Sequence, residues 1–213
     1  MTKLRAAVGA LALLTVAACM NTDPVEPPSP TNPNAVGLVA VGDSITAADS
    51  PDFSAGDLGA ESWVNYVVGE DVELVGGWAA WGATTEEMAH NVEPADGDVL
   101  VIMAGTNDVA LGTPFIESAE NIAQIVAIVG ASEVIIAGIP PIDHAPENAA
   151  GFNQSLQEFA GQRGWQWVDA GAAVRTPENR FARGMAIDGV HPTAAGAKRL
   201  GESVAIAIDE LPG

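Results

Sequence analysis

The stretch "DVLVIMAGTND", residues 98–108, decides the fold. Residues 99–104 form an uninterrupted apolar run, as expected for a strand that is covered on both faces. The run ends in a glycine followed by three polar residues, which indicates a turn. A strand of this kind that leads into a polar turn is typical of a parallel sheet with helices on each side.

Outward from this stretch, strand-like and helix-like patterns alternate along the chain. Short apolar runs predict further strands at 36–44, 71–77, 132–141 and 165–170. Apolar residues at helical spacing predict helices at 61–70, 84–92, 113–130, 147–164 and 192–208. This alternation predicts an α/β domain over residues 36–213. Right-handed crossovers place the C-terminal ends of its strands at one edge, where functional loops gather.

The charge of the chain excludes one class of function. Asp and Glu total 28 against 8 Lys and Arg, so the formal net charge is −20. Such a surface repels nucleic acid phosphates and anionic lipid head groups, and we therefore exclude nucleic-acid binding.

Residues 1–18 have the pattern of a secretory signal peptide. Lys3 and Arg5 form a short positive region, and an uncharged apolar stretch covers residues 6–18. At about 1.5 Å per residue this stretch is too short for the roughly 30 Å of a bilayer core. The mature chain is therefore expected outside the cytoplasm.

The cleavage site leaves two interpretations open. "VAAC", residues 16–19, resembles the lipobox of bacterial lipoproteins, with Cys19 as the residue that is lipidated. Ordinary cleavage after Ala18, which releases a secreted protein, cuts the same bond. Cys19 is the only cysteine of the chain, which favours the lipoprotein at the outer face of the membrane. The proline-rich stretch within residues 19–35 then acts as an extended linker, and the anchor is the only expected membrane contact.

Four short motifs stand where predicted strands end or where the last helix begins. They are "GDSIT" at 42–46, "WGATT" at 81–85, "AGTND" at 104–108 and "DGVHP" at 188–192. In this order they resemble the four sequence blocks of the SGNH hydrolases, the GDSL-type esterase and lipase family. The resemblance covers nearly all of residues 36–210. It implies a three-layer α/β/α sandwich with a five-stranded parallel sheet, the flavodoxin-like fold of that family.

The resemblance also implies a role for one residue or pair in each block. Ser44 matches the nucleophile, although Ile rather than Leu follows it. The backbone N–H of Gly82 and the side-chain amide of Asn107 match the oxyanion hole. Asp188 and His191 match the acid and the base. No metal and no cofactor is implied.

These residue types suit ester hydrolysis. Serine is a weak nucleophile until a neighbouring base takes its proton, and histidine is the side chain whose charge changes near neutral pH. An aspartate orients the imidazole and stabilises its charged form. Donors in an oxyanion hole then stabilise the negative charge that develops on the carbonyl oxygen. The expected function is a serine esterase that works through an acyl-enzyme.

Several rival functions are weighed against this one. An α/β-hydrolase expects G-x-S-x-G, and Ser44 lacks the second glycine. A metal-dependent phosphoesterase is disfavoured because the chain has only 3 histidines. A lipase or thioesterase, an acyltransferase on the same fold, and a non-catalytic lipid-anchored binding module stay as alternatives.

The substrate expected from the sequence is a short acyl ester, such as an acetyl ester of a carbohydrate or another polar carrier. The segment 47–60 after Ser44 is small and acidic, with Phe53 and Leu58 as its only large apolar residues. A long-chain lipase needs a continuous apolar trench, because each buried CH₂ contributes only about 0.8 kcal/mol.

Four aromatic or imidazole side chains have no settled role in the sequence. Trp78 and Trp81 closely precede Gly82 and are either sugar-stacking platforms or buried packing residues. His144 follows the predicted fourth strand at the same edge of the sheet, and whether it lines the pocket is left open by the sequence. His90 lies on a predicted helix and is expected to be a bystander.

Overall fold

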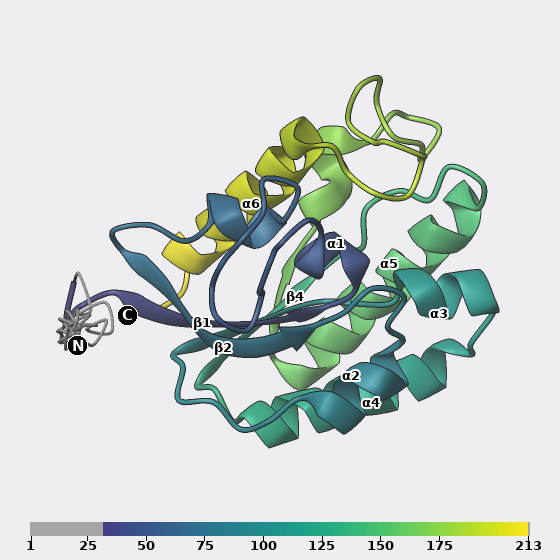
Figure 1. Ribbon diagram of the computed structural model, residues 1–213. Coiled ribbons are helices and arrows are strands. Elements are labelled where there is room, and N and C mark those ends of the chain that lie inside the picture. Colours follow the sequence, from purple (N-terminus) through teal and green to yellow (C-terminus); the bar gives the residue numbers. More distant parts are fainter. Residues whose placement is uncertain (1–31, 213) are drawn as a thin grey trace, which may run out of the picture. The chain divides into compact units, whose positions relative to one another are not determined.

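The computed structural model describes residues 32–212, and its central feature is one five-stranded parallel sheet with strand order β2-β1-β3-β4-β5 (Figure 1). Each pair of neighbouring strands is parallel, which confirms the predicted sheet. The strands are β1 (Val36–Gly42), β2 (Val72–Ala79), β3 (Val99–Met103), β4 (Glu133–Ala137) and β5 (Gln166–Val168).

Helices cover both faces of this sheet. One face packs against α2, α4 and α5, and the other packs against α6 and the short 3₁₀ helices η1 and η2 (Figure 1). This arrangement confirms the predicted three-layer α/β/α sandwich. The helical elements are α1 (Ser44–Ala47), η1 (Trp63–Tyr66), α2 (Thr85–Asn91), α3 (Thr106–Leu111), α4 (Phe115–Val129), α5 (Pro146–Arg163), η2 (Ala170–Val174) and α6 (Ala194–Asp209).

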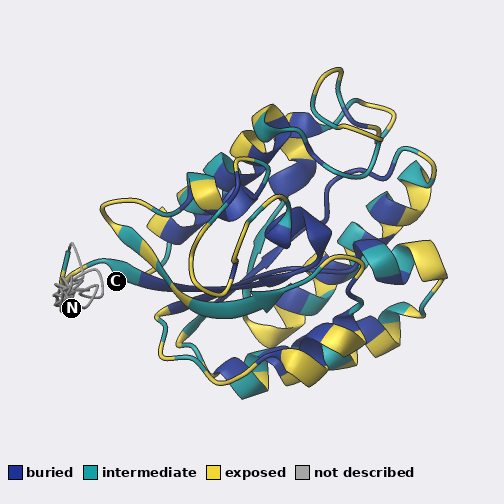
Figure 2. Cartoon of the chain, in the orientation of Figure 1, coloured by how far each residue is buried: buried dark blue, intermediate teal, exposed yellow. Residues whose placement is uncertain are grey.

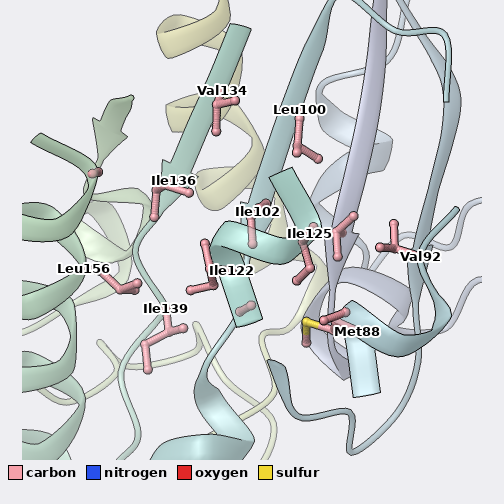
Figure 3. Packing of buried hydrophobic residues seen from close by; sticks show 14 of the residues in the cluster. Met88, Val92, Leu100, Ile102, Ile122, Ile125, Val134, Ile136, Ile139 and Leu156 are labelled. Carbon is pink, nitrogen blue, oxygen red and sulfur yellow. The ribbon is translucent and has the colours of Figure 1, made fainter. Parts of the chain in front are cut away.

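β3 is the central strand of the sheet, and the apolar run 99–104 is buried throughout. Figure 2 shows that the buried segments, in dark blue, gather in the sheet and on the helix faces turned toward it. Because side chains alternate across a strand, β3 supplies both cores. Leu100 and Ile102 pack in the cluster that includes Ile122 and Ile125 of α4 (Figure 3). The other three residues of β3, Val99, Val101 and Met103, pack in the cluster that includes residues of α6.

Local signals in the sequence account for several helix ends. At the start of α2, the Thr84 hydroxyl accepts from the backbone N–H of Glu87, whose side chain accepts from the N–H of Thr84. This reciprocal capping satisfies two N–H groups that have no partner inside the helix. Gly130 caps the end of α4 and Gly164 caps the end of α5, both in the left-handed conformation that glycine adopts without strain.

The helix predicted over residues 61–70 is wrong in extent, because the structure has only the 3₁₀ helix η1 there. Two buried side-chain hydrogen bonds tie this segment to α1. The Ser62 hydroxyl donates to the carbonyl oxygen of Thr46 at 2.6 Å, and the Trp63 indole N–H donates to the Thr46 hydroxyl at 2.9 Å. These bonds hold the start of the segment against α1, and Trp63 is fully buried against the second core.

The predicted signal peptide, Cys19 and most of the linker lie outside the described residues. Within residues 32–212, no helix combines the length and apolarity that a membrane crossing requires.

Candidate active site

The four motifs meet at the C-terminal edge of the sheet. Ser44 is the first residue of α1, shortly after the end of β1, and Asn107 lies on α3 shortly after β3. Gly82 follows β2, and Asp188 and His191 lie on the loop that precedes α6. Loops at this edge carry the functional residues in open parallel sheets. The topology therefore explains how motifs far apart in sequence come together.

A chain of two hydrogen bonds joins three of the predicted residues. The Ser44 hydroxyl lies 3.0 Å from Nε2 of His191, and Nδ1 of His191 lies 2.8 Å from Oδ2 of Asp188. A carboxylate only accepts hydrogen bonds, so Nδ1 carries the proton in the neutral ring. Nε2 is then the acceptor for the Ser44 hydroxyl, as a general base requires.

The loop that carries Asp188 and His191 is closed by short local bonds. The Asp188 oxygen Oδ1 accepts from the backbone N–H groups of His191 at 2.8 Å and Val190 at 3.0 Å. The backbone N–H of Ile187 donates to the carbonyl oxygen of His191 at 2.8 Å. The bond from the His191 N–H is the largest of the causes that lower the pKa of Asp188 to about 2. Asp188 is therefore ionised at neutral pH.

Asp143 holds this loop against the rest of the domain, a role that the sequence does not reveal. Its backbone N–H donates to the carbonyl oxygen of Gly189 at 2.8 Å, and its Oδ1 accepts from the N–H of Phe181 at 2.7 Å. Gly189 has φ +83°, and a Cβ there would meet Asp143 Cβ at 2.8 Å. The glycine of "DGVHP" is therefore required by conformation and by space.

The turn that presents Ser44 is held by a buried carboxyl group. Asp43 is only 1% exposed, and its Oδ1 accepts from the N–H of Ile45 at 2.9 Å. Its Oδ2 and the Thr106 hydroxyl are both buried without a hydrogen-bond partner of normal geometry within the described residues. Burial raises the pKa of Asp43 to about 6, against the opposing effects of the Ile45 N–H, the neighbouring Thr106 hydroxyl and His191.

Three N–H groups are candidates for an oxyanion hole. Gly82 is exposed at φ +73°, and no acceptor within residues 32–212 is bonded to its N–H. Ser44 begins α1, so its N–H has no acceptor within that helix. The Asn107 amide donates one N–H to the carbonyl oxygen of Ala83 at 2.9 Å, and an amide has two. That bond ties Asn107 to the loop that carries Gly82.

Asp108 anchors the helix that carries Asn107. It is buried and accepts from the Thr85 N–H at 3.0 Å, the Thr85 hydroxyl at 2.6 Å and the Ser118 hydroxyl at 2.9 Å. These bonds join the starts of α2, α3 and α4. The final aspartate of "AGTND" therefore has a positioning role, which explains why an acidic side chain is buried there.

Trp81, like Asp143, has a role at the site that the sequence alone does not predict. Its ring stacks on His191, with 5.0 Å between the centroids and 26° between the planes. Its indole N–H donates to the carbonyl oxygen of Ala48 at 2.9 Å. The residue is nevertheless 66% exposed, so it forms a fixed aromatic surface beside Ser44 and not a core contact.

Two hollows meet at Trp81. The smaller, of about 160 Å³, is lined by Ser44, His191, Trp81 and Ile187, among others. The larger, of about 430 Å³, is lined by the segments 47–54 and 77–81. Ala48 and Trp81 line both. The candidate nucleophile therefore opens onto a small hollow with a larger groove next to it.

The remaining histidines lie at the surface. His144 and His90 are exposed, and His90 is at the end of α2. Trp78 lies on β2, half-buried, and contacts the core as well as the larger groove. Within residues 32–212, no group of three or more His, Cys, Asp and Glu side chains has an arrangement suited to a metal ion.

Comparisons with known proteins identify the family and the fold. The GDSL-like lipase/acylhydrolase family model matches residues 40–199. No curated protein gives a significant match. A lipolytic protein of the G-D-S-L family from Veillonella parvula has a TM-score of 0.65 at 17% identity over 83% of this chain and 100% of that chain. The lipase/acylhydrolase from Enterococcus faecalis has a TM-score of 0.64 at 21% identity over 81% and 95%.

A third solved structure is a variant of an acetyl-xylooligosaccharide esterase from Geobacillus stearothermophilus. It has a TM-score of 0.64 at 20% identity over 81% of this chain and 94% of that chain. At these identities the solved structures establish the fold alone. The family model covers most of the domain and carries the assignment. The chain belongs to the GDSL-like lipase/acylhydrolase family.

Proposed function

We propose that the protein is a serine esterase that hydrolyses short-chain carboxylic esters through an acyl-enzyme. The observation that carries the proposal is the 3.0 Å contact between the Ser44 hydroxyl and Nε2 of His191, with Asp188 on the opposite ring nitrogen. Serine becomes an effective nucleophile when a base within hydrogen-bond reach takes its proton.

In the first half of the reaction, Ser44 Oγ attacks the ester carbonyl carbon while His191 Nε2 accepts the hydroxyl proton. Asp188 holds the imidazole by Nδ1 and stabilises its positive charge without itself taking the proton. The carbonyl oxygen becomes negatively charged and is stabilised by the N–H groups of Ser44 and Gly82 and the amide of Asn107. His191 then gives the proton to the alcohol oxygen, the carbon–oxygen bond breaks, and the alcohol leaves.

In the second half, water replaces the alcohol. His191 accepts a proton from the water as its oxygen attacks the acyl carbon. The bond to Ser44 Oγ breaks, Oγ regains the proton from His191, and the carboxylic acid leaves. Each donor in an oxyanion hole is worth about 2.7–4 kcal/mol of barrier, so three donors account for a large part of the expected rate enhancement.

The substrates that we propose are acetyl esters of a carbohydrate or another polar carrier. The hollow at Ser44, about 160 Å³, is smaller than the roughly 300–1,000 Å³ of drug-sized sites. The net charge of −20 disfavours anionic substrates such as phospholipids. One structural relative is described as an acetyl-xylooligosaccharide esterase, which supports the same class.

The direct test is hydrolysis of 4-nitrophenyl acetate by wild type and by Ser44→Ala. We expect the variant to lose at least roughly 1000-fold in kcat, in line with the loss seen when a triad member is removed. Ser155→Ala is the matched control, because the Ser155 hydroxyl donates to the carbonyl oxygen of Gly151 on its own helix, α5. Turnover by folded Ser44→Ala close to that of the control would disprove the serine mechanism.

We also propose that Cys19 is lipidated and that the esterase is held at the outer face of a bacterial membrane, or secreted if that step is absent. The lipobox-like "VAAC" at 16–19 and the proline-rich stretch that follows support this. Cys19→Ser should move the protein from the membrane fraction to the soluble fraction or block its processing. Wild-type protein found entirely in the medium would contradict the anchor.

A further inference from the structure

The larger groove beside Ser44 has the dimensions of a small-molecule site. Its volume is about 430 Å³, within the roughly 300–1,000 Å³ that such sites span. It is formed by two segments, residues 47–54 after the nucleophile and residues 77–81 at the end of β2. Because Ala48 and Trp81 line both this groove and the hollow at Ser44, a molecule bound here lies next to the reacting ester.

The aromatic wall of the groove is fixed in place before any ligand binds. Trp81 is 66% exposed, yet its N–H is bonded to Ala48 and its ring is stacked on His191. Trp78, from the same segment, is packed against the core on its inner side. An exposed aromatic ring that is held at both ends loses little conformational entropy on binding, which is the advantage of preorganisation.

The segment 47–54 contributes polar side chains to the groove beside its apolar ones, Pro51 and Phe53. Ser50, Asp52 and Ser54 line the groove. Asp52 Oδ1 accepts from the Ser54 hydroxyl at 2.8 Å and the Ala55 N–H at 3.1 Å. The Ser54 hydroxyl is the largest cause that lowers the pKa of Asp52, so this carboxylate is ionised at neutral pH. Its other oxygen is available to accept from a ligand hydroxyl.

We propose that this groove binds a neutral pyranose ring of an acylated oligosaccharide, next to the sugar whose ester lies at Ser44. A pyranose ring presents C–H groups on its faces, which pack on indole rings, and hydroxyl groups at its edge, which donate to carboxylates. The walls match those two requirements, and the charge of −20 disfavours acidic sugars. The inference rests on the proposed esterase function and adds a site for the alcohol part of the substrate.

The test compares two esters with the same acyl group. Monoacetylated xylobiose carries a second sugar ring for the groove, whereas 4-nitrophenyl acetate has no such ring. For Trp78→Ala we expect the ratio of kcat/KM, disaccharide ester over nitrophenyl ester, to fall about tenfold through loss of an aromatic contact. Val75→Ala is the control, because Val75 lies on the same strand, is 42% exposed and lies outside the groove. Its ratio should match wild type.

A second variant avoids any loss of core packing. Asp52→Asn keeps an oxygen that accepts from Ser54 and Ala55 but removes the charge, so the ratio should fall several-fold. Unchanged ratios in both variants, with nitrophenyl acetate still hydrolysed, would overturn the sugar site and leave the esterase intact. Selective loss of 4-nitrophenyl octanoate hydrolysis in Trp78→Ala would also overturn it, because the groove would then hold an acyl chain.

Binding without turnover separates this inference from the esterase itself. Calorimetric titration of unacylated xylobiose into wild type should show binding that Trp78→Ala and Asp52→Asn weaken and Val75→Ala does not. Such binding in a protein that hydrolyses neither ester would leave the sugar site standing and disprove only the proposed reaction. No binding by wild type at millimolar xylobiose would overturn the sugar site.

Discussion

The indole ring of Trp81 stacks on the imidazole of His191 at 5.0 Å between centroids, while its N–H is bonded to the carbonyl oxygen of Ala48. The ring therefore restrains one face of the imidazole. It also lines both hollows, so it connects the orientation of the base with the shape of the substrate site.

Trp81→Ala should lower kcat for 4-nitrophenyl acetate by about fivefold, the order expected when a stacked pair worth about 1 kcal/mol is lost. Trp81→Phe keeps a ring next to His191 and should recover much of that loss. The measurement is kcat for the two variants and wild type. Equal loss in both would show that the stack itself has no effect on the base.

Asn107→Ala should lower kcat by about 100- to 1000-fold and leave KM nearly unchanged, because an oxyanion donor acts mainly in the transition state. Asn148→Ala is a control on an exposed residue of α5. The two constants are measured with 4-nitrophenyl acetate. A raised KM with unchanged kcat would assign Asn107 to substrate binding and remove it from the oxyanion hole.

The buried Asp43 should leave a signature in the pH dependence of stability. Its pKa is raised from 3.8 to about 6, so between these values the native state holds a proton that the unfolded chain has lost. Stability contributed by this group is therefore present below about pH 4 and is lost as the pH rises through about 6. A native pKa that is higher by about 2 corresponds to on the order of 3 kcal/mol of unfolding free energy.

Asp43→Asn removes this titration while its side-chain oxygen can still cap Ile45. Urea unfolding between pH 4 and 7 should show wild type losing on the order of 3 kcal/mol relative to the variant. Asp188, with its pKa lowered to about 2, acts in the separate window below pH 4. Asp96→Asn, on an exposed residue, should follow wild type. Parallel profiles for wild type and Asp43→Asn would show that folding does not raise the pKa of Asp43.

A ladder of nitrophenyl esters tests the size of the acyl site. Catalytic efficiency should fall beyond about four carbons, where the small hollow stops adding apolar contact to each further CH₂. The hollow at Ser44 has a volume of about 160 Å³, and its walls include Ala48 and the exposed Ile187. A maximum at eight or more carbons would make the protein a long-chain lipase.

The central strand and the four motifs are the features that the sequence predicts best. Residues 99–104 are buried on both faces, and this continuous apolar run identifies a covered strand without any knowledge of its partners. The strand pattern alone does not give the order of the strands in the sheet. That order depends on how the chain crosses between strands, and it follows here from the family resemblance. Asp188 and His191 are three residues apart and are hydrogen-bonded within one loop. Their pairing is therefore predictable from the local sequence.

Contacts between distant segments are what the sequence does not predict. The stack of Trp81 on His191 joins two loops that are far apart in the chain, and nothing near either residue specifies it. The buried pair of Asp43 and Thr106 likewise depends on the packing of β1 beside β3. The segment 61–70 is another case, because its start is bonded to Thr46 in a distant part of the chain and local periodicity does not specify those bonds.

The central claim is that Ser44 is the nucleophile, and covalent trapping tests it most directly. A fluorophosphonate ester should react once per chain, forming a bond from Ser44 Oγ to phosphorus with loss of fluoride. Mass spectrometry of the digested protein should place the adduct on Ser44 in wild type and in the control His144→Ala, and find none in Ser44→Ala. An adduct on another residue, or full hydrolysis of 4-nitrophenyl acetate by protein labelled at Ser44, would contradict the account.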